Sequence, residues 1–158
     1  MCTIYNNQFL LAIFNNSGNI FKCRYSLIKD EWQGNLFKNI AAIVENRKQK
    51  LIIVNGTHDH VHLLVSFKPN HTVSDLVRDI KSNSTKFIND NGWAYGKFQW
   101  QVGFGAFSVS HSKTKTVYNY IQNQQEHHKK QSFIEEYKML LKIHNIPYED
   151  AYVFDEIY

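Results

Sequence analysis

The sequence has few of the residues that mark secreted, membrane-spanning or disordered proteins. Its two cysteines, Cys2 and Cys23, are too few for a disulfide framework and too far apart for a zinc knuckle, so we expect free thiols and a reducing compartment. Two prolines and seven glycines argue against a linker-rich chain. There is neither an apolar run of about 18 residues nor a basic N-terminus followed by a long apolar stretch. We therefore expect a soluble, cytoplasmic protein without a membrane span.

Apolar and aromatic residues are plentiful by contrast. They make up 43% and 15% of the 158 residues, which is sufficient for one packed core. We expect a single domain over residues 1–158. The formal net charge of +4 permits binding to a polyanion such as nucleic acid, but an ordinary basic protein would have the same charge.

Histidine recurs at every second position near the start of residues 57–67, Thr-His-Asp-His-Val-His-Leu-Leu-Val-Ser-Phe. Side chains of an extended chain alternate between faces, so this pattern predicts a strand with His58, His60 and His62 on one face. The other face would be apolar and consist of Val61, Leu63, Val65 and Phe67. Two such imidazoles can hold one divalent cation, although ordinary surface histidines produce the same alternation.

The other segments predict an α+β fold around this strand. In chain order, their apolar spacing predicts a strand at 8–14 with a turn at 15–19, a helix at 32–48, a strand at 51–54, the histidine strand, a helix at about 73–88, a strand and bend at 98–110, and helices at about 112–128 and 132–144. Asn55-Gly56 predicts a tight hairpin, and Thr72 with Asp75 a helix N-terminus. This order is typical of a ferredoxin-like or RRM-like antiparallel sheet with helices on one face. The histidine face is then left to a substrate or a further helix.

The predicted helix at 112–128 places two polar residues on an apolar stripe. At 100° per residue, one stripe contains Val117, Tyr120, Ile121 and Gln124. Tyr120 and Gln124 would turn inward with their apolar neighbours, where a phenol and an amide need polar partners. A cation on His60 and His62 would be such a partner, with the Gln124 amide oxygen as third ligand and the Tyr120 hydroxyl poised to attack a phosphodiester. A half-buried core tyrosine beside a hydrogen-bonding glutamine is the alternative.

Together these segments resemble the IS200/IS605-family transposases, the small single-domain Y1 enzymes of the HUH nuclease superfamily, which include REP-associated tyrosine transposases. The resemblance rests on Asp59-His60-Val61-His62-Leu63-Leu64-Val65 as the metal motif and on Tyr120-Ile121-Gln122-Asn123-Gln124 as the nucleophile helix. Further agreement lies at residues 75–81, 103–110 and 127–141. The resemblance covers roughly residues 50–150.

The resemblance implies that Tyr120 is a nucleophile that forms a 5′-phosphotyrosine link. It implies that His60, His62 and Gln124 bind Mg²⁺ or Mn²⁺. It also implies a homodimer that acts on single-stranded DNA with hairpins, in which the tyrosine helix of one subunit can complete the site of the other.

The resulting hypothesis is a DNA strand transferase, with a C-terminal helix carrying the nucleophile. Basic side chains would hold the DNA backbone, and the candidates are Arg78, Lys81, Lys113 and Lys115. Two alternatives stay open. One is a module of the same fold that binds hairpin DNA or RNA without cleaving it, and the other is a metal-dependent phosphodiesterase acting on a small phosphoester.

Overall fold

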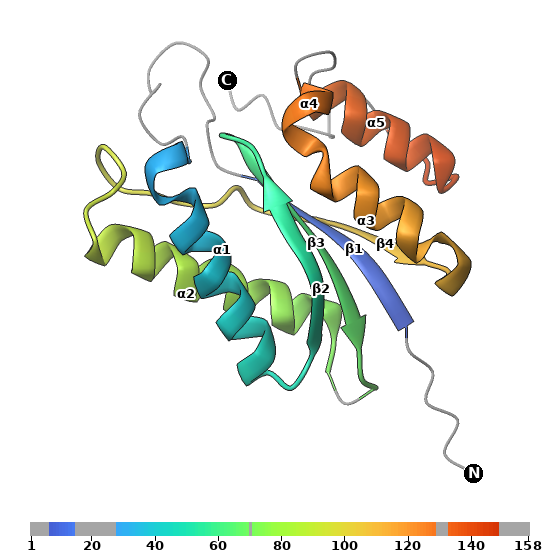
Figure 1. The fold of residues 1–158 in the computed structure, drawn as a ribbon, viewed down its shortest axis with the longest axis horizontal. Coiled ribbons are helices and arrows are strands. Elements are labelled where there is room, and N and C mark those ends of the chain that lie inside the picture. The colour runs from blue at the N-terminus through green and yellow to red at the C-terminus, as the bar shows by residue number, and fades with distance from the viewer. Residues whose placement is uncertain (1–6, 15–27, 70, 129–132, 149–158) are drawn as a thin grey trace.

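The computed structural model describes residues 7–14, 28–69, 71–128 and 133–148, so the predicted turn at residues 15–19 lies outside the described residues. The elements are β1 (Asn7–Phe14), α1 (Asp30–Asn46), β2 (Lys50–Gly56), β3 (His60–Phe67), α2 (Val73–Asp90), β4 (Gly105–Val109), the short 3₁₀ helix η1 (His111–Lys113), α3 (Thr114–Gln122), α4 (Gln124–His128) and α5 (Phe133–Ile143). The strands form one antiparallel sheet in the order β2-β3-β1-β4 (Figure 1). The predicted ferredoxin-like α+β fold is confirmed.

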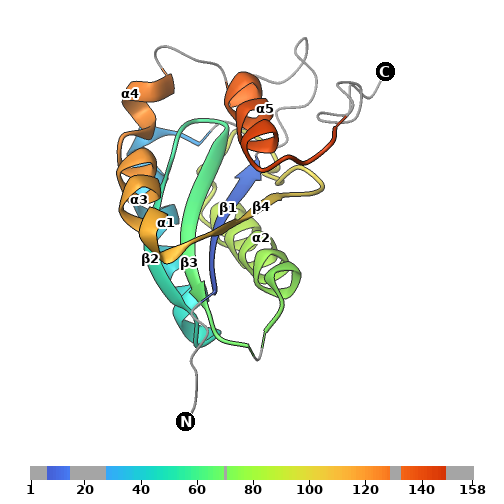
Figure 2. The same cartoon turned by 90° about the vertical axis from the view of Figure 1, so that its right-hand side faces the viewer.

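Helices cover both faces of the sheet. In Figure 1, α1 and α2 lie on one side of the strands and α3, α4 and α5 on the other. Figure 2 shows α3 running alongside β2 and β3. The histidine face, predicted to receive a substrate or a further helix, is therefore packed against helices. Among the helices that the structure describes, none combines the length and apolar composition needed to cross a bilayer.

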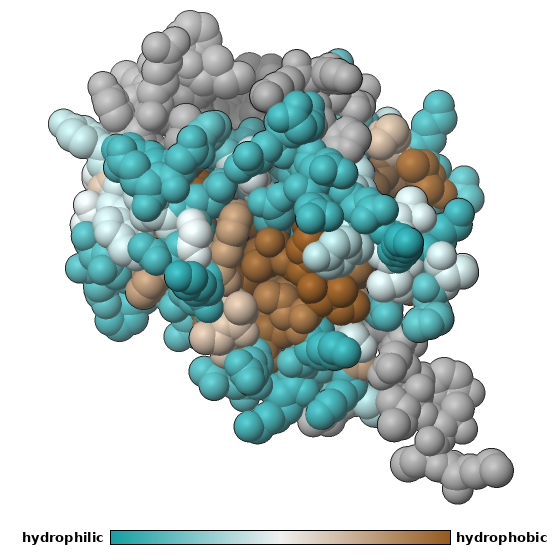
Figure 3. All heavy atoms as spheres, viewed as in Figure 1, coloured by the Kyte–Doolittle hydropathy of each residue, from teal (hydrophilic) through white to brown (hydrophobic). Residues whose placement is uncertain are grey.

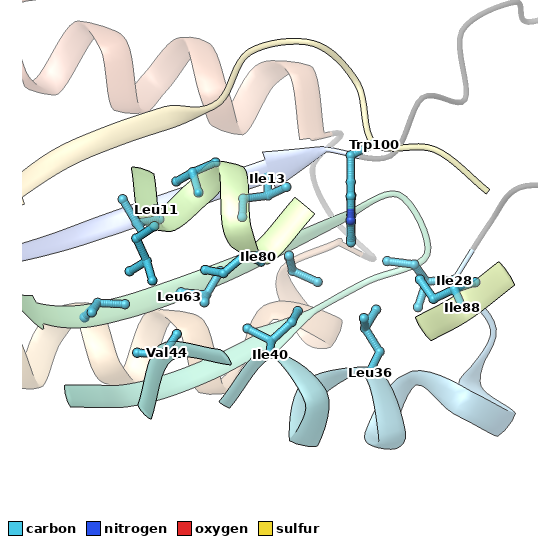
Figure 4. Close-up of a cluster of buried hydrophobic side chains, with 14 of the residues drawn as sticks. Leu11, Ile13, Ile28, Leu36, Ile40, Val44, Leu63, Ile80, Ile88 and Trp100 are labelled. Atoms are coloured by element: carbon cyan, nitrogen blue, oxygen red, sulfur yellow. The ribbon is translucent and has the colours of Figure 1, made fainter. Parts of the chain in front are cut away.

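The main core lies between the sheet and the α1–α2 layer. On α1, Leu36, Ile40 and Val44 recur every four residues and are fully buried, as the helical period requires. Figure 4 shows these side chains facing Leu63 of β3 and Ile80 of α2. The predicted alternation of β3 is confirmed, because Val61, Leu63, Val65 and Phe67 all belong to this core.

The connection from β2 to β3 differs from the predicted two-residue hairpin. Asn55 and Gly56 are still part of β2 and pair with His62 and Val61, so the chain turns at residues 57–59 instead. Gly56 is required by close packing, since a Cβ there would collide with the His60 carbonyl oxygen. The prediction of a tight Asn-Gly turn was therefore wrong.

The predicted helix at 112–128 is also divided. It consists of η1, α3 and α4, with Asn123 interrupting the helical geometry at ψ 17° between α3 and α4. By contrast, the predicted N-terminus of α2 is confirmed, because the Thr72 hydroxyl accepts a hydrogen bond from the Asp75 amide at 3.1 Å.

Candidate active site

The beginning of β3 places two imidazoles beneath the α3–α5 layer. His60 and His62 are fully buried, and their ring centroids lie 4.8 Å apart. Their side chains point the same way because they are two residues apart on a strand held between β2 and β1. His58 lies before the strand, is exposed, and bonds through Nδ1 to the Ile28 carbonyl at 2.8 Å. The cluster therefore contains two of the three histidines predicted to share a face.

A carboxylate fixes the orientation of the first imidazole. Asp59 Oδ1 lies 2.7 Å from His60 Nδ1 and accepts a hydrogen bond from the Thr57 hydroxyl, also at 2.7 Å. When the Nδ1 proton is donated to this carboxylate, Nε2 of His60 presents its lone pair to the interior of the site. Such carboxylate–imidazole pairs are typical of histidines that bind metals.

Asn55 of β2 anchors the end of α3 above the histidines. Its side-chain NH₂ donates to the carbonyl oxygens of Ile121 at 2.8 Å and Gln122 at 3.1 Å, two groups that a helix C-terminus leaves without helical partners. The fully buried Ile121 packs with Leu64 and Phe107 of the sheet. These contacts fix both the height and the rotation of the helix that carries the tyrosine.

Tyr120 and Gln124 lie over the imidazoles, as the helical stripe predicted. The Tyr120 ring centroid is 6.0 Å from that of His62, and the fully buried Gln124 places Oε1 3.3 Å from His60 Nε2. The structure thus brings Tyr120, His60, His62 and Gln124 together within one chain.

A fifth polar group in the cluster, Glu136 of α5, was not among the predicted site residues. It is 3% exposed, and its Oε1 accepts a hydrogen bond from Gln124 Nε2 at 3.0 Å. The carboxylate oxygens also lie 3.7 Å from His62 Nε2 and 4.0 Å from His60 Nε2. Burial raises the pKa of Glu136 to about 7, with His60 opposing and Asp59 adding to the shift.

The sequence contains a signal for this residue. Glu136 follows Phe133 by three positions and precedes Leu140 by four, so it falls on the apolar stripe of its helix. A carboxylate on the buried stripe of an amphipathic helix needs a partner inside the protein. That criterion, applied to residues 132–144, would have selected Glu136.

The donor set fits a divalent cation. Ligand atoms of His60, His62 and Glu136 all lie within 4.8 Å of one another. An octahedral ion with bonds of about 2.1 Å separates its ligands by roughly 3 to 4.2 Å, and the separations around Gln124 and Glu136 are 3.3, 3.7 and 4.0 Å. In the tautomer whose Nδ1 proton is donated to Asp59, the Nε2 lone pair of His60 faces the Gln124 amide oxygen, and a cation between these two acceptors would remove their repulsion. The two oxygens suit Mg²⁺ or Mn²⁺, and the imidazoles favour the transition metal.

The four predicted DNA-binding residues lie in two different layers. Arg78 and Lys81 belong to α2, on the far side of the sheet from Tyr120. Lys81 donates to the Gln101 carbonyl at 2.8 Å, and burial lowers its pKa. Lys113 and Lys115 are exposed on η1 and α3, in the same layer as Tyr120.

Comparison with known proteins identifies the family. The family model described as "Transposase IS200 like" matches residues 19–124, two thirds of the chain, and this segment includes both histidines, the tyrosine and Gln124. The comparison with curated proteins gave no significant match.

Two solved structures have a similar fold. A candidate transposase from Deinococcus radiodurans R1 is 22% identical, with 78% of this chain and 95% of that chain covered and a TM-score of 0.57. A REP-associated tyrosine transposase bound to a REP hairpin is 15% identical, with 81% of this chain and 70% of that chain covered and a TM-score of 0.55. The family match over most of the sequence is decisive: the chain belongs to the IS200-like transposases.

Proposed function

We propose that this transposase-family protein is a metal-dependent strand transferase that cleaves and rejoins single-stranded DNA through Tyr120. The observation that carries the proposal is the convergence of Tyr120 and Gln124, from α3 and α4, on the two imidazoles of β3. A tyrosine packed only as a core residue would not explain two histidines, a glutamine and a glutamate gathered beneath it.

In the proposed step, the Tyr120 oxygen forms a bond to the scissile phosphorus and the bond from phosphorus to the 3′ oxygen breaks. The phenol loses its proton, the leaving 3′ oxygen gains one, and the 5′ phosphate stays on the tyrosine. Attack by another 3′ hydroxyl reverses the step and joins two strands. A bound Mg²⁺ or Mn²⁺ would polarise the phosphate oxygens. His60, His62 and Gln124 would hold it, with Glu136 as a fourth ligand.

The proposed substrate is single-stranded DNA marked by hairpins. Support comes from the family and from a structural neighbour that is bound to a REP hairpin. We also propose that the whole chain forms one transposase domain and works in the cytoplasm as a homodimer. The cluster is complete within one chain, so catalysis in cis is consistent with this arrangement.

Access to the cluster requires movement of α5. His60, His62 and Gln124 are fully buried, and Glu136 lies over them from α5. A DNA phosphate reaches the imidazoles only after this helix shifts and the hydrogen bond between Gln124 and Glu136 is broken or exchanged.

The test is covalent capture of DNA. Labelled single-stranded hairpin DNA from the sequence flanking the coding region is mixed with protein and Mn²⁺ and separated on a denaturing gel. We expect a protein–DNA adduct that is abolished in Tyr120→Phe. The matched control is Tyr118→Phe, since Tyr118 is exposed on α3 two residues away and should be dispensable.

An unchanged adduct in Tyr120→Phe would reject the proposal. Hairpin binding without metal and without any adduct would favour the non-cleaving module. Turnover of a chromogenic phosphodiester that is indifferent to Tyr120→Phe would favour the phosphodiesterase.

A further inference from the structure

A hollow lies on the histidine face of the sheet, at the end of α3 that is distant from Tyr120. Its volume is about 250 Å³, and it is lined by Gln8, Lys50, Ile52, Ser66, Lys68 and His111. Ser66 pairs directly with Gln8 of β1 and with Lys50 of β2, and direct antiparallel partners share a face. Ser66 alternates in step with His62, so this face is the one that carries the imidazoles.

The floor of the hollow is polar and its rim is cationic. Gln8 and Ser66 are 8% and 9% exposed, whereas Lys50, Lys68 and His111 are exposed. The amide oxygen of Gln8 accepts a hydrogen bond from the Thr114 hydroxyl, so its NH₂ group is the part that can donate to a ligand. Buried donors below two ammonium groups form a site suited to a phosphate.

No carboxylate neutralises these positive charges among the residues that line the hollow or in the segment 91–125. The lining residues include no acidic side chain, and residues 91–125, which contain β4, η1 and α3, include no aspartate or glutamate. Lys113 and Lys115 lie on η1 and α3, the elements that also contain the lining residue His111 and Thr114, the hydrogen-bond partner of Gln8. A local field of one sign attracts a polyanion.

The wall of the hollow also has an apolar component. Ile52 of β2 is half-buried and lines it. In Figure 3 an apolar patch lies at the centre of the view, where β2 runs in Figure 1, and hydrophilic side chains surround it. Apolar surface next to cations suits a nucleotide, which has a charged backbone and an apolar base face.

We propose that this hollow binds a phosphodiester of the single-stranded DNA that flanks the scissile bond. Helix α3 joins the two places, because it begins at Thr114 beside the hollow and ends at Gln122 beside the active site. Along β3, Ser66 is four residues from His62, about 13 Å at 3.3 Å per residue, a span of a few nucleotides. The inference rests on the proposed function, since it assigns a contact for the same DNA substrate.

The test measures DNA binding without the chemistry. Fluorescence anisotropy of labelled (dT)20 is recorded in EDTA over a range of salt concentrations for the full chain. In single-stranded DNA each neutralised phosphate contributes about 0.7 to the slope of log affinity against log salt. We therefore expect the double variant Lys50→Gln/Lys68→Gln, which removes the contact to this one phosphodiester, to lower the slope by about 0.7 and the affinity at low salt by roughly tenfold.

Two further variants separate the hollow from net charge and from folding. Lys38→Gln/Lys97→Gln removes the same charge at exposed positions outside the hollow and should leave the slope almost unchanged. Lys50→Arg/Lys68→Arg preserves the charges and should retain binding.

Equal losses of slope in the two glutamine pairs would overturn the proposal. So would a Lys50→Gln/Lys68→Gln protein that loses affinity for inorganic phosphate but binds (dT)20 normally, because the hollow would then be a small-anion site. The adduct assay distinguishes failure of the proposed DNA contact in the hollow from failure of the proposed strand transfer. Absence of an adduct with the expected slopes would reject strand transfer alone, whereas a normal adduct with unchanged slopes would reject the hollow alone.

Discussion

The two faces of β3 serve different purposes, although their residues alternate along one strand. The face towards α1 and α2 belongs to a cluster of 17 buried apolar residues, whereas the face towards α3 and α5 belongs to a cluster of six, among the residues that the structure describes. The second face also carries two imidazoles, and α4 and α5 place an amide and a carboxylate against them, all buried. The larger core stabilises the strand, and the rigid strand then holds polar groups that would by themselves destabilise the interior.

Adjacent leucines test this division most strongly. Leu63 faces α1 and α2, Leu64 faces α3 and α5, and both are fully buried. Leu63→Ala should lower the free energy of unfolding by about 3 to 5 kcal/mol and Leu64→Ala by about 2 to 3 kcal/mol, because the larger cluster leaves the worse cavity. Urea denaturation measures both values.

The rate of adduct formation should be affected in the opposite order, more by Leu64→Ala than by Leu63→Ala. Leu64 packs with Ile121, the neighbour of Tyr120, so Leu64→Ala should slow adduct formation per folded molecule. Leu63→Ala should leave that rate unchanged at a temperature where the variant is folded. A greater loss of stability in Leu64→Ala, or equal rates in both, would break the comparison.

The buried carboxylate makes the second face sensitive to pH. Burial raises the pKa of Glu136 from 4.5 to about 7, so between these values the folded state binds more protons than the unfolded state. The free energy of unfolding of the metal-free protein should therefore fall as pH rises through this window, by up to about 3 kcal/mol. Glu136→Gln should flatten this part of the profile.

The control for that measurement is Glu45→Gln, which alters an exposed glutamate on α1 and should keep the wild-type profile. Denaturation in EDTA at pH 5, 6, 7 and 8 provides the comparison. A slope that persists in Glu136→Gln would assign the pH dependence to another group.

A smaller loss of stability is expected on replacing two asparagines that bind the C-terminal ends of helices on opposite sides of the sheet. Asn55 donates to the end of α3, and Asn91 donates to the Phe87 carbonyl at the end of α2 at 2.8 Å. Either change to alanine should lower the free energy of unfolding by about 1 kcal/mol. Only Asn55→Ala should slow adduct formation, since only α3 carries the tyrosine. A similar slowing in Asn91→Ala would show that general loosening, not the position of α3, controls the rate.

The sequence predicted the parts of the site that depend on local periodicity. The two-residue period of β3 separates His60 and His62 from the core residues, and the helical period groups Tyr120 with Gln124. Both patterns are properties of a single element, so they hold wherever that element packs. The order of elements was sufficient to predict the sheet as well.

The features that were missed depend on contacts between distant elements. Glu136 reaches the histidines only because α5 folds back over β3, at a separation of 74 positions from His62 (136 minus 62). The division of the predicted helix at Asn123 coincides with Asn55 binding the last carbonyls of α3. Likewise Gly56 continues β2 because the returning chain passes too close for a side chain, not because it forms the turn.

The most direct test of the central claim is Mn²⁺ binding followed by electron paramagnetic resonance. We expect the wild-type chain to bind one Mn²⁺. His62→Ala should lose more than about 100-fold in affinity, because removing a direct ligand costs more than the roughly 10- to 100-fold loss from removing an outer-shell partner. His58→Ala should bind Mn²⁺ normally, because that imidazole lies outside the cluster. Undiminished binding in His62→Ala, or equal losses in both variants, would contradict the assignment of β3 as the strand that holds the metal.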